Sequence, residues 1–188
     1  MAVVRLLGDP DSTRAWAQGA QGEAQTARQL ERHLSGRGVI VLHDRRIPGR
    51  GNIDHLTVGP GGITVIDTKS SRGRLQLRTV GGILSPRREQ LLVNRRDRTS
   101  QLDGLGRQIA AVKRVLAKAN LDQVQVLAAL CYPNIDGLPR LGQLRARSGT
   151  IIIDHPRGVA KLARRPGPLN LQLITQVAEQ LARRLPPA

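Results

Sequence analysis

The chain has 188 residues, and its 39% hydrophobic content is almost entirely aliphatic, which is enough for the core of one ordinary domain. Thirty lysines and arginines against 14 acidic residues give a net charge of +16, so we expect a polyanionic partner, nucleic acid above all. No apolar run approaches the roughly 20 residues of a membrane-spanning helix, and Asp9 interrupts the start before a signal-peptide core could form, so a cytoplasmic location is expected.

The first predicted element is an amphipathic helix over residues 14–34, preceded by an N-terminal tail at residues 1–13. Its predicted apolar stripe, with spacings of three and four, consists of Trp16, Ala20, Ala27, Leu30 and Leu34. Glu23 falls within this stripe, where a carboxylate is costly unless it reaches an edge or faces a metal or a cation. Gly19 and Gly22 thin the helix beside it, so another backbone can approach there. Glu23 is therefore a candidate site residue.

A short buried strand at residues 39–42 and a basic loop at residues 44–51 are predicted next. Arg45, Arg46 and Arg50 in this loop are candidates for phosphate binding, and the alternative is a plain solvated loop.

Two further strands are predicted at residues 52–58 and 63–69, separated by Gly59-Pro60-Gly61-Gly62. We interpret these four residues as a hairpin loop. A phosphate-binding loop is disfavoured, because no Lys-Ser/Thr pair and no helix follows.

The hairpin places acidic side chains opposite each other. If Val58 pairs with Ile63, Asp54 stands opposite Asp67, and Lys69 points to the same face of the sheet. Two carboxylates that close repel each other unless a cation lies between them, and Mg²⁺ is commonly held by one or two carboxylates. Such an ion can polarise a phosphodiester, and a nearby ammonium can stabilise the developing charge. The alternative is a salt-bridged end of a sheet.

The rest of the chain alternates basic and apolar segments. Residues 72–98 are predicted to form a basic meander with strands at 74–80, near Ile83 and at 90–94, in which Arg72 and Arg74 are candidates for nucleic-acid binding. Helices are expected at residues 100–119, 157–165 and 169–185, and buried strands at 124–130 and 150–153. Cys131 is expected to be a buried thiol in a reducing compartment.

These segments resemble a known family. The stretches GAQGEAQTARQLERHL, VIVLHDRRIPGR and GNIDHLTVGPGGITVIDTKSSRG resemble the nuclease-related domain (NERD) family, a branch of the PD-(D/E)xK superfamily, over roughly residues 14–118. The resemblance implies a restriction-endonuclease-like α/β fold, with a mixed central sheet flanked by helices in a single domain over residues 14–188. The implied catalytic residues are Glu23, Asp54, Asp67, Lys69 and Gln108. The implied metal ligands are Asp54, Asp67, Thr68 and Glu23.

The expected function is that of a nuclease that uses Mg²⁺ or Mn²⁺ to hydrolyse DNA phosphodiester bonds in DNA processing or repair. With one Trp and one Tyr, base stacking is scarcely available, so DNA binding should be backbone-directed with weak sequence preference, and RNA stays open as a second ligand. The alternatives are a catalytically inactive nucleic-acid-binding module of the same fold and a basic protein-interaction or ribosome-associated factor. His43, His55 and His155 lack a paired ligand spacing, so a metal role for them is disfavoured.

Overall fold

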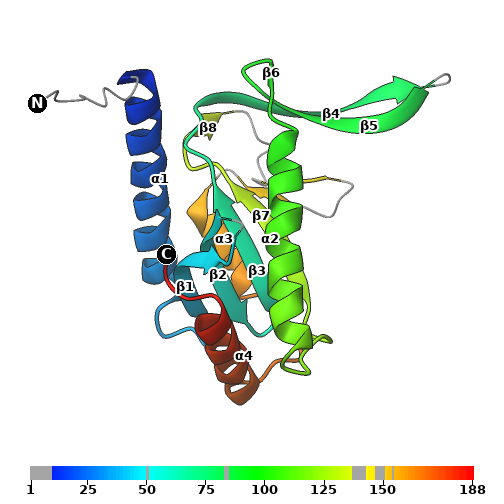
Figure 1. The fold of residues 1–188 in the computed structure, drawn as a ribbon. Helices are drawn as coiled ribbons and strands as arrows, with labels where there is room; N and C mark the ends of the chain where they lie inside the picture. The colour runs from blue at the N-terminus through cyan, green and yellow to red at the C-terminus, as the bar shows by residue number, and fades with distance from the viewer. Residues whose placement is uncertain (1–9, 50, 83–84, 137–142, 147–150, 154) are drawn as a thin grey trace, which may run out of the picture.

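A mixed six-stranded sheet forms the centre of the protein. The computed structural model describes residues 10–49, 51–82, 85–136, 143–146, 151–153 and 155–188 (Figure 1). The strand order is β1-β2-β3-β7-β10-β9. The strands comprise β1 (Ile40–Ile47), β2 (Gly51–Gly59), β3 (Gly62–Thr68), β7 (Val126–Cys131), β9 (Gln143–Arg145) and β10 (Ile151–Ile153). Neighbours pair in antiparallel fashion except for β3-β7 and β7-β10, which are parallel. The predicted mixed central sheet is confirmed.

Two pairs of helices cover the two faces of this sheet. The helices are α1 (Pro10–Leu34), α2 (Ser100–Ala117), α3 (Pro156–Ala163) and α4 (Leu171–Arg184). Leu30 of α1 and Val159 of α3 share one buried cluster with Ile66 of β3, whereas Val112 of α2 and Leu181 of α4 belong to the cluster on the opposite face. No helix within the described ranges has the length and hydrophobicity that crossing a bilayer requires.

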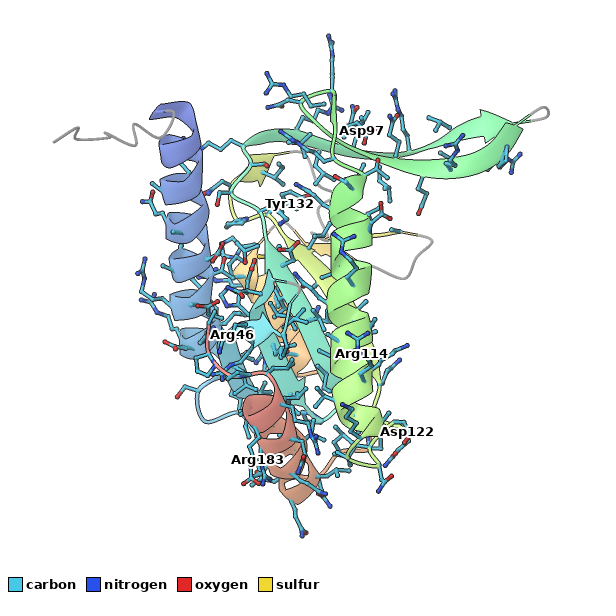
Figure 2. All side chains as sticks on the ribbon, in the orientation of Figure 1. Arg46, Asp97, Arg114, Asp122, Tyr132 and Arg183 are labelled. Atoms are coloured by element: carbon cyan, nitrogen blue, oxygen red, sulfur yellow. The ribbon has the colours of Figure 1, made fainter. Side chains whose placement is uncertain are left out.

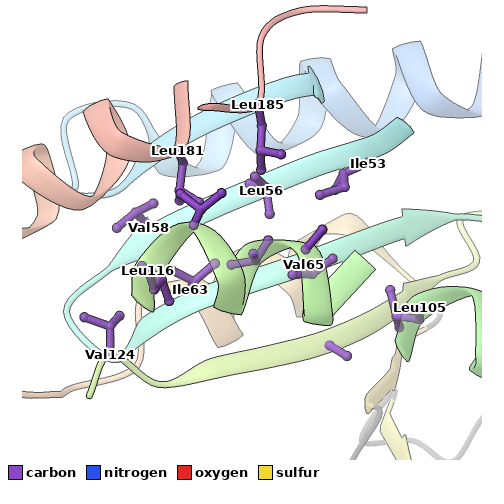
Figure 3. Packing of buried hydrophobic residues seen from close by; sticks show 14 of the residues in the cluster. Ile53, Leu56, Val58, Ile63, Val65, Leu105, Leu116, Val124, Leu181 and Leu185 are labelled. Carbon is purple, nitrogen blue, oxygen red and sulfur yellow. The ribbon is translucent and has the colours of Figure 1, made fainter. Parts of the chain in front are cut away.

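The larger cluster holds the sheet and two helices together (Figure 3). Leu56 and Val65, paired across β2 and β3, are fully buried there together with Leu116 and Leu181. Each such side chain contributes about 1.5–3 kcal/mol by leaving water. Cys131, as predicted, is buried, and it belongs to the cluster on the other face.

The segment predicted as a basic loop at residues 44–51 is mostly strand. β1 continues to Ile47 and pairs with β2 down to the couple Ile47 and Gly51. Two observations explain the difference. The side chain of Ile47 is buried, and the backbone amide of Arg46 donates a hydrogen bond to the carbonyl of Pro186 near the end of the chain. A pairing across 140 residues has no signature in the local sequence. Arg50 lies outside the described residues.

The β2-β3 hairpin has the predicted register with a shorter turn. Val58 pairs with Ile63, and Gly59 pairs with Gly62, so the loop consists of Pro60 and Gly61 alone and the prediction of a four-residue loop was wrong. The two paired glycines lie in strands and not in the loop. Gly59 allows α3 to pack closely, because a Cβ at this position would collide with the carbonyl of Ala163.

A second, four-stranded sheet extends the molecule, with the order β6-β5-β4-β8. Its strands comprise β4 (Gly73–Gly82), β5 (Ser85–Val93), β6 (Arg96–Asp97) and β8 (Ile135–Asp136). The hairpin of β4 and β5, which we call the arm, projects past α2 (Figure 1). Residues 72–98 thus form a basic meander, as predicted, in which β4 and β5 make one long hairpin and the short β6 pairs with β5. The strand predicted near Ile83 lies outside the described residues.

Candidate functional site

A polar cleft of about 630 Å³ opens between α1 and α2. It is lined by Glu23, Asp44, Ile47, Gly51, Asn52, Asp54, Asp67, Lys69, Ser100, Gln101, Gly104, Arg107 and Gln108. The five residues predicted to be catalytic, which come from α1, β2, the end of β3 and α2, are all among them.

Asp54 and Asp67 lie together at one end of the β2-β3 hairpin. Their strands pair from Gly59 and Gly62 as far as His55 and Ile66, so the two aspartates follow next in the same register. The backbone amide of Thr68 donates to Asp54 Oδ2 at 2.7 Å, which fixes the orientation of this carboxyl group. Asp67 is 6% exposed. The predicted opposition of the two acids therefore places them side by side in a largely buried spot.

This proximity has an electrostatic cost. Burial and the charge of Asp67 raise the pKa of Asp54 to about 8, although the hydrogen bond from Thr68 acts in the opposite direction. Burial, followed by the charge of Asp44, also raises the pKa of Glu23. Both shifts disfavour ionised carboxylates, and a cation in the cleft would relieve that cost.

Lys69 supplies one positive charge at this point. Its Nζ lies 2.9 Å from Asp67 Oδ1, and the lysine side chain is 28% exposed. The amide of Lys69 donates to the carbonyl of Cys131, which continues the β3-β7 pairing one residue beyond the strand. Lys69 thus lies on the same side of the sheet as Asp67, as the strand alternation predicted.

Glu23 reaches the cleft because α1 packs closely beside β3. A Cβ on Gly22 would collide with the hydroxyl of Ser70, so glycine permits the close approach that was expected here. The Ser70 hydroxyl also donates to the carbonyl of Gly19 at 3.4 Å.

The predicted stripe of α1 is rotated, however. The buried positions are Gly22, Thr26, Leu30 and Leu34, whereas Ala20 is exposed and Glu23 is half-buried. The side chain of Trp16 lies outside the described residues. Glu23 therefore borders the packed stripe instead of interrupting it.

Two glutamines of α2 face the cleft, of which the sequence predicted one. Gln108 donates from Nε2 to the carbonyl of Asn52 at 3.3 Å. Gln101, seven residues earlier and so on the same face of the helix, accepts a short hydrogen bond from the hydroxyl of Tyr132. Burial, followed by the charge of Asp67, raises the pKa of Tyr132, so the phenol keeps its proton and remains the donor. This hydrogen bond occupies the amide oxygen of Gln101, whose side chain lines the cleft.

Asp44 is a second cleft residue that was not predicted as part of the site. Its backbone has a φ of +45°, and the side chain of Asn52 donates to Asp44 Oδ1 at 3.1 Å. The β1-β2 pairing that joins His43 to His55 places Asp44 beside Asp54, and the sequence missed it because residue 44 was predicted to lie in a loop.

The arginines predicted to bind nucleic acid are spread over three places. Arg45 is half-buried and Arg46 exposed in β1, and neither lines the cleft. Arg72 borders a second polar hollow of about 360 Å³, and Arg74 is exposed on the arm. Arg50 lies outside the described residues. The structure thus separates these residues instead of gathering them.

The histidines have structural contacts. His43 and His55 meet through their Nδ1 atoms at 2.9 Å, and burial lowers the pKa of His55 to about 3. His155 caps α3, because its Nδ1 accepts a hydrogen bond from the backbone amide of Arg157. Over the described ranges, no three His, Cys, Asp or Glu side chains are arranged as a set that could hold a metal ion. The donors that fit a divalent ion are the two carboxylates of Asp54 and Asp67, with water for the remaining positions.

A comparison with protein families gives one match. Residues 18–133, more than half of the chain, match the sequence model of the family described as "NERD: Nuclease-related domain". The matched span contains Glu23, Asp54, Asp67 and Lys69 as well as both cleft glutamines. No match was found among curated proteins or among solved structures.

Proposed function

Because the chain belongs to the nuclease-related domain family, we propose that it is a metal-dependent nuclease that hydrolyses DNA phosphodiester bonds in the cleft between α1 and α2. One observation carries the proposal: Asp54, Asp67 and Lys69 meet in that cleft, with two buried carboxyl groups beside one ammonium. A buried pair of acids lowers the stability of the fold. A divalent cation bound between the two carboxylates would offset that cost, and their oxygen atoms are the ligands that such a cation prefers.

The donor set supports Mg²⁺ or Mn²⁺ as the cofactor. Both acids offer hard oxygen ligands, and their Coulomb repulsion is relieved when a divalent charge replaces a proton between them. When bound, such an ion polarises the phosphodiester and lowers the pKa of the attacking water. Asp54 and Asp67 would hold it. Glu23, on the opposite wall, would position water.

The remaining cleft residues have roles that follow from their contacts. Lys69 is close enough to Asp67 for its ammonium to be fixed beside the ion, where it stabilises the negative charge that develops on the phosphate. The amide of Gln101, held by Tyr132, donates a hydrogen bond to a phosphate or sugar oxygen. Gln108 is engaged with the carbonyl of Asn52, so its role is to support the edge of β2 near Asp54.

The proposal is tested with purified protein on plasmid and linear DNA in the presence of Mg²⁺ or Mn²⁺. We expect cleavage by the native chain, and none by Asp67→Asn. The matched control is Asp122→Asn, which removes one acid from an exposed position outside the cleft and should cut like the native chain. Metal-dependent cleavage that persists in Asp67→Asn would refute the proposed site. DNA binding without cleavage by the native chain would instead indicate an inactive module of the same fold.

A further inference from the structure

The arm and the residues that flank it concentrate positive charge outside the cleft. Residues 72–98 contain eight arginines and two acidic residues. The arginines are Arg72, Arg74, Arg78, Arg87, Arg88, Arg95, Arg96 and Arg98, and all eight are exposed. Many of the side chains drawn on the arm and around its root end in blue nitrogen atoms (Figure 2). None of these arginines lines the acidic cleft, so the proposed chemistry leaves this charge without a role.

The two sides of the arm differ in chemistry. On one side, Leu75, Leu91 and Val93 are buried in the cluster that also contains Leu105 of α2. The opposite side carries Arg78, whose Nε donates to Gln90 Oε1 at 3.0 Å across the strand pair. Alternation along β4 and the pairing of Val80 with Arg88 place Arg74 and Arg88 on that same side. The arm is thus fixed by an apolar side and presents a basic one.

The root of the arm is held rigidly next to the cleft. Asn94 accepts the amide of Arg74 and donates to the carbonyl of Arg72, both at 2.9 Å. Gly73 has a φ of +98°, and a Cβ there would collide with the Asn94 side chain, so glycine is required for this clamp. β4 begins four residues after Lys69, and β5 is followed by the short β6 and then by Ser100 and Gln101, both of which line the cleft.

We propose that the arm is a binding element for duplex DNA, in which Arg74, Arg78 and Arg88 contact the sugar–phosphate backbone of the substrate that the cleft cuts. The inference rests on the proposed function for its choice of nucleic acid as the partner. Guanidinium groups match phosphate oxygens with two parallel hydrogen bonds, and their planar, pre-organised donors lose less side-chain freedom for each hydrogen bond that forms.

The shape of the arm favours a duplex over a single strand. A two-stranded β-ribbon fits the major groove of B-DNA, and strands of nine to ten residues extend about 30 Å, close to one helical turn. Binding of single strands relies on stacking of bases on aromatic rings, but the sequence has one Trp and one Tyr, neither of them within residues 72–98. The major groove of duplex RNA is too narrow for such a ribbon, so the arm selects DNA.

The test compares two double variants that remove equal charge from different places. Arg78→Ala with Arg88→Ala removes two arm arginines, whereas Arg32→Ala with Arg37→Ala removes two exposed arginines at the C-terminal end of α1, far from the arm (Figure 1). Binding to a labelled duplex of about 25 base pairs, more than two helical turns, is measured by fluorescence anisotropy in EDTA over a range of salt concentrations. The same measurement is made with single-stranded DNA and with duplex RNA.

We expect the arm variant to bind duplex DNA about tenfold more weakly at 0.1 M salt and to lose about two from the slope of log K against log salt, since each phosphate contact contributes roughly 0.9. The α1 variant should keep the native slope. Equal losses in both variants would overturn the inference, as would tighter native binding to the single strand or to RNA. EDTA removes cleavage from the experiment. If the native chain binds duplex DNA through the arm but never cuts it, the proposed role of the arm is supported and the proposed nuclease activity is refuted.

Discussion

The cleft and the arm treat charge in opposite ways. The cleft gathers Glu23, Asp44, Asp54 and Asp67 around one ammonium, in a chain whose net charge is +16. The arm spreads arginines over an exposed strand pair. In the cleft, burial makes the charges of Asp54 and Asp67 expensive and their removal consequential, whereas on the arm water screens each charge and the effects are small and additive. The difference teaches that the two regions suit different tasks, so we assign the proposed chemistry to the neighbouring acids of the cleft and the proposed binding to the dispersed arginines of the arm.

The largest effect is expected from the cleft lysine. Lys69→Ala should lower DNA cleavage by roughly 10²–10³-fold, because it removes the one ammonium beside Asp67 that stabilises developing charge. Duplex binding in EDTA should change by less than about threefold, since the loss of one contact is a small part of backbone binding. Single-turnover cleavage and anisotropy measure the two. Lys113→Ala, an exposed lysine of α2 away from the cleft, serves as the control. If binding and cleavage fall by the same factor, Lys69 acts through binding and the proposed division of roles between the cleft and the arm is wrong.

A second test concerns the packing that brings α1 to the cleft. Gly22→Ala should destabilise the protein by about 1–3 kcal/mol, because its Cβ would meet the Ser70 side chain and overpack the contact. Gly19→Ala, three residues earlier on the same helix with open space around its Cβ, should be neutral or slightly stabilising. Chemical denaturation of both variants measures the difference. If they have equal stabilities, the close approach of α1 is not what positions Glu23.

The acid pair makes a prediction about stability and pH without metal. The pKa of Asp54 is raised in the folded state from 3.8 to about 8, so between these values the folded protein holds a proton that the unfolded chain has lost. Stability contributed by this group is therefore lost as the pH rises through that window. Asp54→Asn keeps an acceptor for the Thr68 amide and removes the titration. The free energy of unfolding of this variant, relative to that of the native chain, should therefore increase from pH 4 to pH 8, by about 1–3 kcal/mol. Thermal unfolding in EDTA measures it, and a constant difference between the two proteins would contradict the buried pair.

The smallest effect is expected from the support of Gln101. Tyr132→Phe removes the hydroxyl that holds the glutamine carbonyl and leaves the buried ring in place. Cleavage should fall by about three- to tenfold, corresponding to one hydrogen bond of ~1 kcal/mol. The additional loss in Tyr132→Phe with Gln101→Ala should be small, because both changes remove the same amide donor. Fully multiplicative effects in this double-mutant cycle would show that Tyr132 does not act through Gln101.

The sequence predicted the centre of the site because that centre is local. A hairpin register follows from a turn and two alternating strands, and it correctly placed Asp54, Asp67 and Lys69 on one side of the sheet. The order of the helices and of the longer strands also followed from periodicity, whereas the mixed sheet was an implication of the family resemblance. The hairpin register and the order of elements depend on residues that are close together in the sequence.

The features that were missed depend on distant contacts. β1 is extended by segments near residue 186, where the amide of Ala188 donates to the carbonyl of Asp44. The stripe of α1 is rotated toward Gly22 and Thr26 by its packing against the segment after β3. Gln101 meets Tyr132 across 31 residues. No local pattern encodes these pairings, because each is decided by which surfaces meet after the sheet has formed.

Binding of Mn²⁺ measured by titration calorimetry tests the central claim most directly. The native chain should bind the ion and release protons when the titration is run near pH 7, because the ion displaces the proton that Asp54 otherwise holds. Asp54→Asn and Asp67→Asn should each lose this binding, while Asp122→Asn should retain it. Equal Mn²⁺ affinity in the native protein and in both cleft variants would contradict the account.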